Sequence, residues 1–289
     1  MNPTMIAQMI INGILIGGIY AVISIGLNII FGVLKVINFA HGEFLMLSMY
    51  ASYWLCALYG LNPYIALPLT TAIMFVFGVA LERILIKPLL KAPPINQLLS
   101  TAALMLVLQN VALVLWHADY RSLTIKTFSI RLGDIYISGH RLIALIGALA
   151  TTLLFYYFLM KTDTGRRIRA VAQDPEVSSI LGINVPLIQT LTFGLGAALA
   201  GIAGALMISI YFVYPTVGTS FGLMAWIIIV LGGLGSFIGA FVGSFIIGLI
   251  ESIAATIWSL ELAKAIAFIV FLLVLFFKPT GLFGEKARV

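Results

Sequence analysis

Charged side chains are scarce in this sequence, and their scarcity excludes a surface that faces water all round. Only 9% of the 289 residues are Asp, Glu, Lys or Arg, whereas 62% are hydrophobic and the mean hydropathy is +1.15. A soluble domain carries about 25% charged residues. The chain is therefore predicted to be an integral membrane protein whose solvent is lipid.

Cysteine and histidine are also rare. The single cysteine, Cys56, excludes an intrachain disulfide and a thiolate metal cluster, and three histidines offer little more to a metal. The sequence contains no G-x-x-x-x-G-K-[ST] phosphate loop, no H-E-x-x-H and no G-x-S-x-G motif. We therefore expect neither ATP hydrolysis through a phosphate loop in this chain nor a hydrolase site, and no cofactor or metal.

The formal net charge of +6 does not indicate a nucleic-acid partner, because no basic face with interleaved aromatic residues occurs. The basic residues instead lie in short clusters between apolar runs, which is typical of cytoplasmic loops beside membrane spans. The two clearest clusters are Arg83, Lys87 and Lys91, and Lys161, Arg166, Arg167 and Arg169. Both clusters are expected on the cytoplasmic side.

Apolar runs long enough to cross a membrane follow one another along the chain. A span needs about 20 mostly apolar residues. The candidate spans are 5–31, 36–59, 64–84, 97–117, 142–160, 186–211, a long glycine-rich stretch at 222–259, and 262–277. Residues 1–34 carry no charge, so the first run is expected to be a retained span and not a signal peptide.

The basic clusters set the expected topology. They place the N-terminus and the loop 118–141 outside, where alternating apolar residues about Gly133-Asp134 predict a small hairpin with a two-residue turn. The basic tail, with Lys278, Lys286 and Arg288, favours a cytoplasmic C-terminus, but two simple spans after residue 212 would leave it outside. A break at 232–235 removes this conflict. We therefore expect one domain over 1–289, an all-α polytopic bundle of eight or nine membrane segments, with nine preferred.

Small residues recur at four-residue spacing in two late segments. They are Gly196, Ala200 and Gly204, and Gly235, Gly239 and Gly243. This spacing lets helices approach closely in lipid, so tight packing is the favoured interpretation. The alternative, for the stretch from Gly232 through Gly233 to Gly239, is a flexible break that lines a pathway.

The segment 161–184 carries the start and stop signals of a short helix between two spans. The start signals are Asp174 as the cap, Pro175 at the first helical position and Glu176 behind it. Its apolar face comprises Val177, Ile180 and Leu181, and Gly182 supplies a left-handed stop. A helix over 175–181 is too short to be stable alone, so we expect it to dock into something. An ordinary interfacial helix is the alternative.

A polar cluster enters the second span within the run 36–44, VINFAHGEF. Asn38 and His41 are three residues apart and share a helix face, but His41 and Glu43 do not, so no metal pair is predicted. For Glu43 we favour a buried hydrogen-bonding role over a headgroup contact or a proton-coupling role. Glu251, near the end of a later span, is expected at the membrane interface.

Four motifs resemble the LivH-type permeases of bacterial ABC importers for branched-chain amino acids. The run 36–44 is similar to their signature, and 164–170 followed by 181–184 is similar to their cytoplasmic coupling segment. The glycine-rich stretch 232–236, with Gly239 and Gly243, and the ending 278–284, KPTGLFG, are also similar to the family. The resemblance covers essentially the whole chain, in order.

The resemblance implies a type II-like ABC importer permease in the bacterial cytoplasmic (inner) membrane. Its implied partners are a second homologous permease, two cytoplasmic ATPase subunits and a periplasmic substrate-binding protein, besides membrane lipid. Candidate residues for coupling to the ATPases are Gly165, Arg166, Ala170, Asp174, Pro175, Glu176, Leu181 and Gly182. Candidates for translocation or packing are Asn38, His41, Glu43, Gly232, Gly233, Gly235 and Gly239. No residue is expected to be catalytic.

The expected function is that of a permease subunit moving leucine, isoleucine and valine into the cytoplasm, while partner subunits hydrolyse ATP. The resemblance does not fix the substrate, and urea or short amides remain open. An ion-coupled secondary transporter is a second possibility, in which Glu43 or Glu251 would be the coupling carboxylate. A membrane scaffold without transport is a third.

Overall fold

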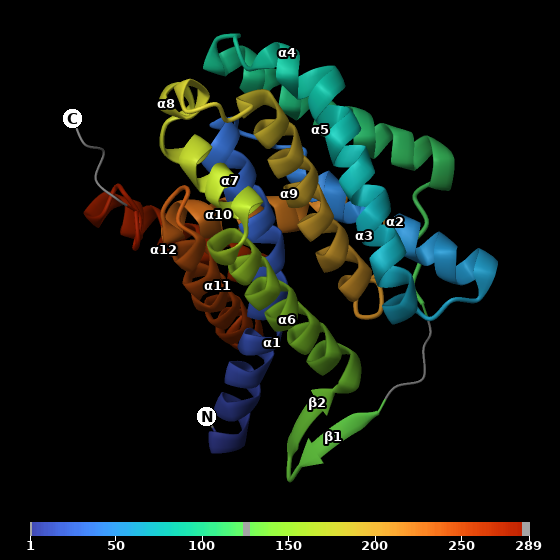
Figure 1. The fold of residues 1–289 in the computed structure, drawn as a ribbon. Coiled ribbons are helices and arrows are strands. Elements are labelled where there is room, and N and C mark those ends of the chain that lie inside the picture. Colours follow the sequence, from blue (N-terminus) through green and yellow to red (C-terminus); the bar gives the residue numbers. More distant parts are fainter. Residues whose placement is uncertain (1, 124–127, 285–289) are drawn as a thin grey trace.

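The computed structural model describes residues 2–123 and 128–284, which form a bundle of helices with one small hairpin (Figure 1). The helices are α1 (Pro3–Leu34), α2 (His41–Tyr59), α3 (Pro63–Leu81), a π-helical turn (Glu82–Ile86), α4 (Lys87–Leu89), α5 (Pro94–Trp116), α6 (Gly139–Lys161), α7 (Asp163–Gln173), α8 (Pro175–Ile180), α9 (Val185–Met207), α10 (Val217–Gly232), α11 (Phe237–Ile257) and α12 (Leu260–Phe277). The strands are β1 (Ser129–Leu132) and β2 (Ile135–Ser138).

Seven helical stretches of the described chain are long and apolar enough to cross a membrane. They are α1, the continuous stretch Pro63–Leu89, α5, α6, α9, α11 and α12. The shorter α10 is also apolar, and α2 has 19 residues but is not among the seven. The multi-pass helical architecture predicted from the sequence is therefore confirmed, while the expected total of eight or nine segments depends on whether α2 and α10 also cross.

Helix α1 is the centre of the bundle, and α6, α9, α10 and α11 pack around it (Figure 1). Its residues carry no charge, which allows almost the whole helix from Leu15 onward to be buried. Glycines let α11 approach it closely, since a Cβ on Gly248 would lie 2.6 Å from the carbonyl oxygen of Gly13 and 2.9 Å from Cα of Gly17. Small residues at such contacts are how helices associate in lipid.

The small residues of α9 have the packing role that their spacing predicts. A Cβ on Gly196 would lie 2.6 Å from the Gly26 carbonyl oxygen of α1, and one on Gly204 would lie 2.6 Å from the Leu45 carbonyl oxygen of α2. Ala200, between them, is fully buried. Helix α9 is therefore held between α1 and α2 by backbone-to-backbone proximity.

The predicted break at 232–235 is confirmed, because α10 ends at Gly232 and α11 begins at Phe237. Gly233 and Gly235 have φ angles of 105° and 85°, a region in which residues with a Cβ are strained. The expectation that Gly235 shares a helix face with Gly239 and Gly243 is wrong, because Gly235 precedes the helix. The long apolar stretch 222–259 is thus two helices and not one.

The hairpin predicted within 118–141 is present among the described residues. Strands β1 and β2 are antiparallel, and the pair Leu132–Ile135 closes on the two-residue turn that contains Gly133. Gln8 of α1 anchors β2, because its Oε1 accepts from Tyr136 N at 2.8 Å and its Nε2 donates to Tyr136 O at 2.9 Å. Residues 124–127 of this loop, and Lys286 and Arg288 of the tail, lie outside the described residues.

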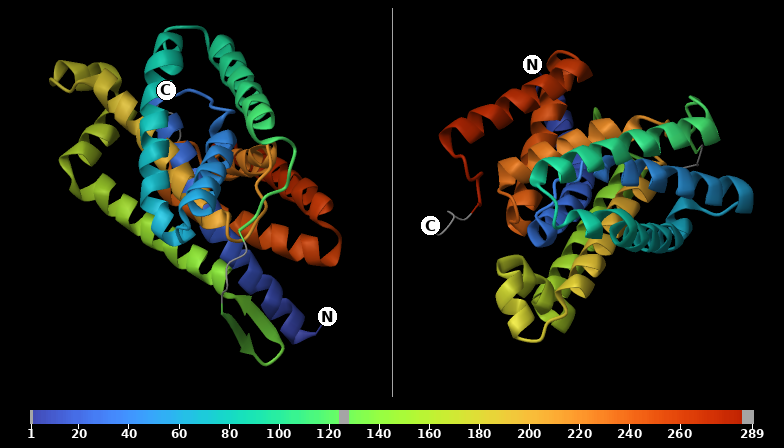
Figure 2. Two further views of the ribbon diagram at one scale, coloured as in Figure 1. Left: turned by 90° about the vertical axis from the view of Figure 1, so that its right-hand side faces the viewer. Right: turned by 90° about the horizontal axis from the view of Figure 1, so that it is seen from above.

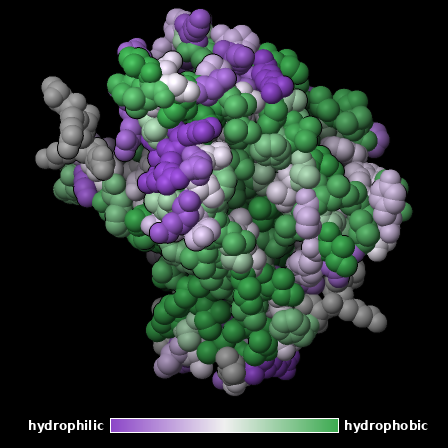
Figure 3. Space-filling model, in the orientation of Figure 1, coloured by the Kyte–Doolittle hydropathy of each residue, from purple (hydrophilic) through white to green (hydrophobic). Residues whose placement is uncertain are grey.

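The surface divides into hydrophilic ends and a hydrophobic middle. In Figure 3, hydrophilic residues gather where α4, α7 and α8 lie, and hydrophobic residues cover most of the face below them. Large apolar side chains of the membrane-length helices, such as Val114, Leu154 and Phe276, are at least 70% exposed. Helices α5 and α12 lie at the periphery (Figure 2) and are mostly exposed. Such a surface is stable in lipid and not in water.

We expect Gly248→Ala to destabilise the bundle by about 1–3 kcal/mol, because the added methyl group meets the α1 backbone. Gly32→Ala is the matched control, since its Cβ would have only one neighbour, Gly235 Cα, at 3.7 Å. The measurement is the thermal unfolding midpoint of each purified variant in one detergent. Equal midpoints for the two variants would contradict close α1–α11 packing.

Candidate functional site

Two regions hold the residues that the sequence singles out, and the first is the α7–α8 segment between α6 and α9. The chain turns sharply after α6, where Oγ1 of Thr162 accepts from Gly165 N at 3.0 Å. A Cβ on Gly165 would collide with the carbonyl oxygens of Phe158 and Leu159. Gly165 therefore allows α7 to fold back against the end of α6.

Helix α8 has the start and stop predicted from the sequence. Asp174 Oδ1 accepts from Glu176 N at 2.9 Å and from Val177 N at 3.0 Å, which caps the helix that Pro175 begins. The helix ends at Ile180, one residue earlier than predicted, and Gly182 has a φ of 81°. The backbone N–H of Asp174 also donates to the Ala170 carbonyl at 3.0 Å, which joins the two helices.

The apolar side of α8 is uncovered in this chain. Val177, Ile180 and Leu181 are 50%, 85% and 74% exposed, while Ser178 on the other side is buried. The helix stands at the hydrophilic end of the bundle beside α7 (Figures 1 and 3). Apolar side chains at such a position are removed from water only if another protein or the membrane surface covers them.

Helix α7 gives this end a basic surface. Arg166, Arg167 and Arg169 are exposed, whereas Ile168 and Val171 are buried against the bundle. Arg166 pairs with Asp163, and its hydrogen bond and charge lower the pKa of that carboxyl. Both side chains of this pair are exposed, so it adds little to stability.

The second region is the turn into α2, where the structure brings Asn38 and His41 to the side of α1. Asn38 Oδ1 accepts from Ala40 N at 3.1 Å and shapes the turn. His41 Nε2 lies 3.1 Å from the Ile23 carbonyl oxygen, so this nitrogen is the donor. The imidazole packs edge-on against Phe44. Both side chains are fully buried, and their contacts fix where α2 begins.

Glu43 joins three helices. It is fully buried, and its Oε1 accepts from Gln109 Nε2 of α5 at 2.9 Å and lies 3.4 Å from Thr219 Oγ1 of α10. The same Gln109 nitrogen lies 2.8 Å from Thr219 Oγ1. These contacts are those of a buried hydrogen-bonding group. A carboxylate in an apolar bundle requires such partners because lipid supplies none.

The glycine-rich break between α10 and α11 is hydrogen-bonded to α1, and the helix ends on either side of it contact one another. Gly235 N donates to Asn28 Oδ1 at 2.8 Å. A Cβ on Gly232 would collide with the backbone of Gly239, so the end of α10 and the start of α11 touch directly. Of the four candidate glycines, Gly232 and Gly239 pack on one another, Gly235 turns the chain, and Gly233 both turns the chain and packs against Gly284.

The C-terminal motif KPTGLFG, residues 278–284, lies against this break and bonds to the end of α10. Leu282 N donates to the Leu231 carbonyl at 2.8 Å, and Phe283 N donates to the Gly232 carbonyl at 2.9 Å. These carbonyls at the end of α10 would otherwise lack a helical partner. Two motifs that are far apart in the sequence thus form one structural unit.

Sequence reasoning did not single out the polar partners of these helices. Asn28 is the last of the side-chain amides in the uncharged run 1–34, and an amide so far along an apolar span is the signal that could have found it. Glu82, buried in the π-helical turn, accepts from Thr190 Oγ1 of α9 at 2.6 Å. Glu251 is only 5% exposed and accepts from Tyr20 at 2.6 Å, so it is a buried hydrogen-bonding group, and its expected place at the membrane interface stays a prediction.

Within the described part of the chain, no group of three or more His, Cys, Asp or Glu side chains could hold a metal ion.

Comparison with known proteins places this architecture in a family. Residues 9–275 match the family model described as "Branched-chain amino acid transport system / permease component". The chain is 32% identical to the high-affinity branched-chain amino acid transport system permease protein BraD of Pseudomonas aeruginosa, over 96% of this chain and 95% of that protein. It is 31% identical to the corresponding permease protein LivH of Escherichia coli K12, with the same coverage.

A more distant relative is the probable branched-chain amino acid transport permease protein LivH of Methanocaldococcus jannaschii, at 25% identity over 96% of this chain and 92% of that protein. With its membrane-length helices, the chain is a multi-pass protein of the cytoplasmic membrane. It belongs to the family of branched-chain amino acid transport system permease components.

Proposed function

We propose that this chain is the permease subunit of an ATP-driven importer that carries leucine, isoleucine and valine into the cytoplasm. Its partners are a second homologous permease, two cytoplasmic ATPase subunits that hydrolyse the ATP, and a periplasmic binding protein that delivers substrate. The observation that carries this proposal is the uncovered apolar side of α8, which stands on a membrane protein of this family. A chain that has a docking helix and no phosphate loop suits a subunit driven by a separate motor.

The topology follows from the basic residues. The clusters at 83–91 and 161–169 belong to the end of the bundle that carries α4, α7 and α8, so we assign this end to the cytoplasm. The hairpin and the segment 118–141 then face the periplasm. If α2 and α10 enter the membrane beside the seven longer helices, the segment count is nine and the described C-terminal residues are cytoplasmic.

The coupling segment has a direct mechanical connection to the transport bundle. Single residues join α6 to α7 and α7 to α8, and the four residues 181–184 join α8 to α9, which packs on α1, α2 and α3. If an ATPase dimer binds α8, its closure would therefore move α6 and α9. In this mechanism, ATP biases the bundle between inward-facing and outward-facing arrangements.

The substrate class is supported by the family description and by the printed names of the bacterial relatives. Urea and short amides are the alternative cargo for the same ATP-driven role. Oε1 of Glu43 accepts from Gln109, while its Oε2 is buried without a hydrogen-bond partner among the described residues. An ion-coupled transporter is therefore disfavoured by the family match and not by the geometry of Glu43.

We expect leucine uptake by proteoliposomes only when the chain is combined with both ATPases, the second permease, the binding protein and ATP. The chain alone under a proton gradient should be inactive, because it has no motor. Uptake is measured with radiolabelled leucine, with urea as the competing cargo. Gradient-driven uptake by the chain alone would refute the importer role, and ATP-driven uptake of urea without leucine would refute the substrate.

Ile180→Ser together with Leu181→Ser should abolish at least about nine-tenths of ATP-driven uptake while the chain stays in the membrane, because the docking contact is lost. Gly182→Val should act in the same direction, since its Cβ has open space but its φ of 81° strains a branched residue. Co-purification of the ATPase is the second measurement.

The matched control for Gly182→Val is Gly60→Val in the loop after α2, which has a φ of 65° and the same open space. Its uptake per molecule and its ATPase recovery should remain normal. Full uptake by the Gly182 and Ile180 variants would remove the coupling role from α8.

Glu43→Leu should lower the stability of the bundle by about 1–3 kcal/mol, because Gln109 and Thr219 lose their buried acceptor. Glu43→Gln keeps an acceptor oxygen and should cost less. The measurements are thermal unfolding and the pH profile of uptake. A Glu43→Gln protein with normal stability and a lost pH response would instead indicate proton coupling.

A further inference from the structure

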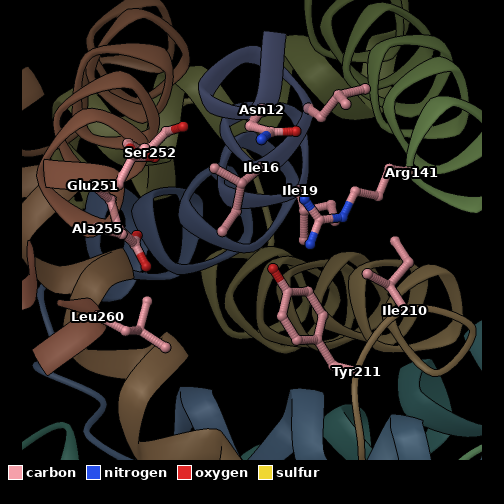
Figure 4. A pocket seen from close by; sticks show the side chains of 12 residues that line it. Asn12, Ile16, Ile19, Arg141, Ile210, Tyr211, Glu251, Ser252, Ala255 and Leu260 are labelled. Atoms are coloured by element: carbon pink, nitrogen blue, oxygen red, sulfur yellow. The ribbon is translucent and has the colours of Figure 1, made fainter. Parts of the chain in front are cut away.

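A cavity of about 180 Å³ lies between α1, α6, the turn that follows α9, α11 and the start of α12, at the end of the bundle nearer the hairpin (Figures 1 and 4). It is apart from the α7–α8 segment and from the glycine break. Of the residues that the sequence singled out, only Glu251, the alternative coupling carboxylate, lines it. The cavity therefore requires its own explanation.

Two opposite charges enter this cavity from different sides. In Figure 4, the guanidinium of Arg141 extends from α6 and the carboxylate of Glu251 extends from α11. Within the described residues, the two side chains make no ion pair with one another, since the pairs found are Arg121–Asp119 and Arg166–Asp163.

Each charge retains capacity for a ligand. Glu251 Oε2 accepts from Tyr20 at 2.6 Å, but among the described residues Oε1 has no hydrogen-bond partner. The Arg141 guanidinium likewise donates to no described residue, and the phenol of Tyr211 lies beside it on the cavity wall (Figure 4). Separated charges within a membrane bundle are costly and usually mark a ligand or ion path.

Much of the wall between the charges is aliphatic, and the polar side chains of Asn12, Ser252 and Thr256 complete the lining. Leu15, Ile16 and Ile19 of α1 line one side, and Ile210 and Leu260 line the others. A site with one fixed cation, one fixed anion and an aliphatic wall is complementary to a molecule with the same three features. Binding sites commonly have this form, in which few polar groups orient a ligand within an apolar pocket.

We propose that this cavity is a substrate site of the permease itself, which holds an aliphatic α-amino acid as its zwitterion. The ligand carboxylate binds Arg141, the ammonium binds Oε1 of Glu251, and the branched side chain lies against Ile16 and Ile19. This inference rests on the proposed function, whose substrate it specifies. It makes the permease select its cargo by charge, so a neutral amide such as urea satisfies neither charged side chain.

The test is binding of radiolabelled leucine to the full chain in lipid nanodiscs, in competition with two analogues. Leucinamide lacks the carboxylate, and 4-methylpentanoate lacks the ammonium group. In the unsubstituted chain we expect leucine to bind at least about tenfold more tightly than either analogue, because each lost contact is a hydrogen bond between charged groups.

Each variant should lose the selectivity for leucine over a different one of the two analogues. Arg141→Gln should weaken leucine binding at least about tenfold and remove its advantage over leucinamide. Glu251→Gln should remove the advantage over 4-methylpentanoate, and Arg141→Lys should restore part of the carboxylate preference. A purely structural role would weaken all ligands equally. Arg131→Gln on the exposed hairpin and Glu261→Gln on the exposed start of α12 are matched controls and should bind as the unsubstituted chain does.

Three results would overturn the site: no leucine binding by the unsubstituted chain, equal affinity for leucine and leucinamide, or the same loss for every ligand in both variants. Displacement of leucine by phosphatidylethanolamine but not by valine would assign the cavity to a zwitterionic lipid headgroup and also overturn it. Uptake by the complete ATP-supplied importer tests the function separately. Normal leucine uptake with any of these results would leave the importer role intact and remove only the site.

Discussion

The contact between α1 and its neighbours is the constraint on which the rest of the structure depends. In lipid there is no hydrophobic force to drive one apolar helix against another, so the helices must gain contact by approaching closely. Gly17 and Gly248 permit this between α1 and α11, and Gly26 and Gly196 permit it between α1 and α9. Because its neighbours all pack on α1, they are fixed relative to one another. Among them are α6 and α11, which carry Arg141 and Glu251 of the cavity.

Polar side chains then act as specific links within this apolar frame. The pairs Asn28–Gly235, Glu82–Thr190 and Tyr20–Glu251 each join two elements that are distant in sequence. An unsatisfied polar group in a membrane interior is expensive, so each pair disfavours arrangements that would separate it.

The sequence predicted local features well because they depend on neighbouring residues. The cap at Asp174, the left-handed Gly182, the hairpin turn at Gly133 and the break after Gly232 all follow from backbone chemistry within a few positions. Family resemblance assigned a coupling role to the segment 161–184 as a whole, and that role stays a prediction. The run of apolar residues also correctly predicted a multi-pass bundle.

The tertiary partners could not be predicted in this way. Glu251 has no charged neighbour in sequence, and only the fold brings it to Tyr20, 231 positions away. Periodicity likewise placed Gly235 on a helix that begins two residues later, because four-residue spacing does not distinguish a helix face from a turn with positive φ. The cavity depends on five segments at once, and no pattern within any one of them indicates it.

The pairing of residues 282–283 with the end of α10 has a consequence for how the protein is made. The carbonyls of Leu231 and Gly232 receive their donors from a segment that leaves the ribosome only after α11 and α12. Until then, the end of α10 has polar groups without partners, and the bundle is incomplete. Membrane insertion can therefore proceed helix by helix, but the α10–α11 corner is completed only after α12 has been made, and a nascent chain stalled within α12 would leave this corner open.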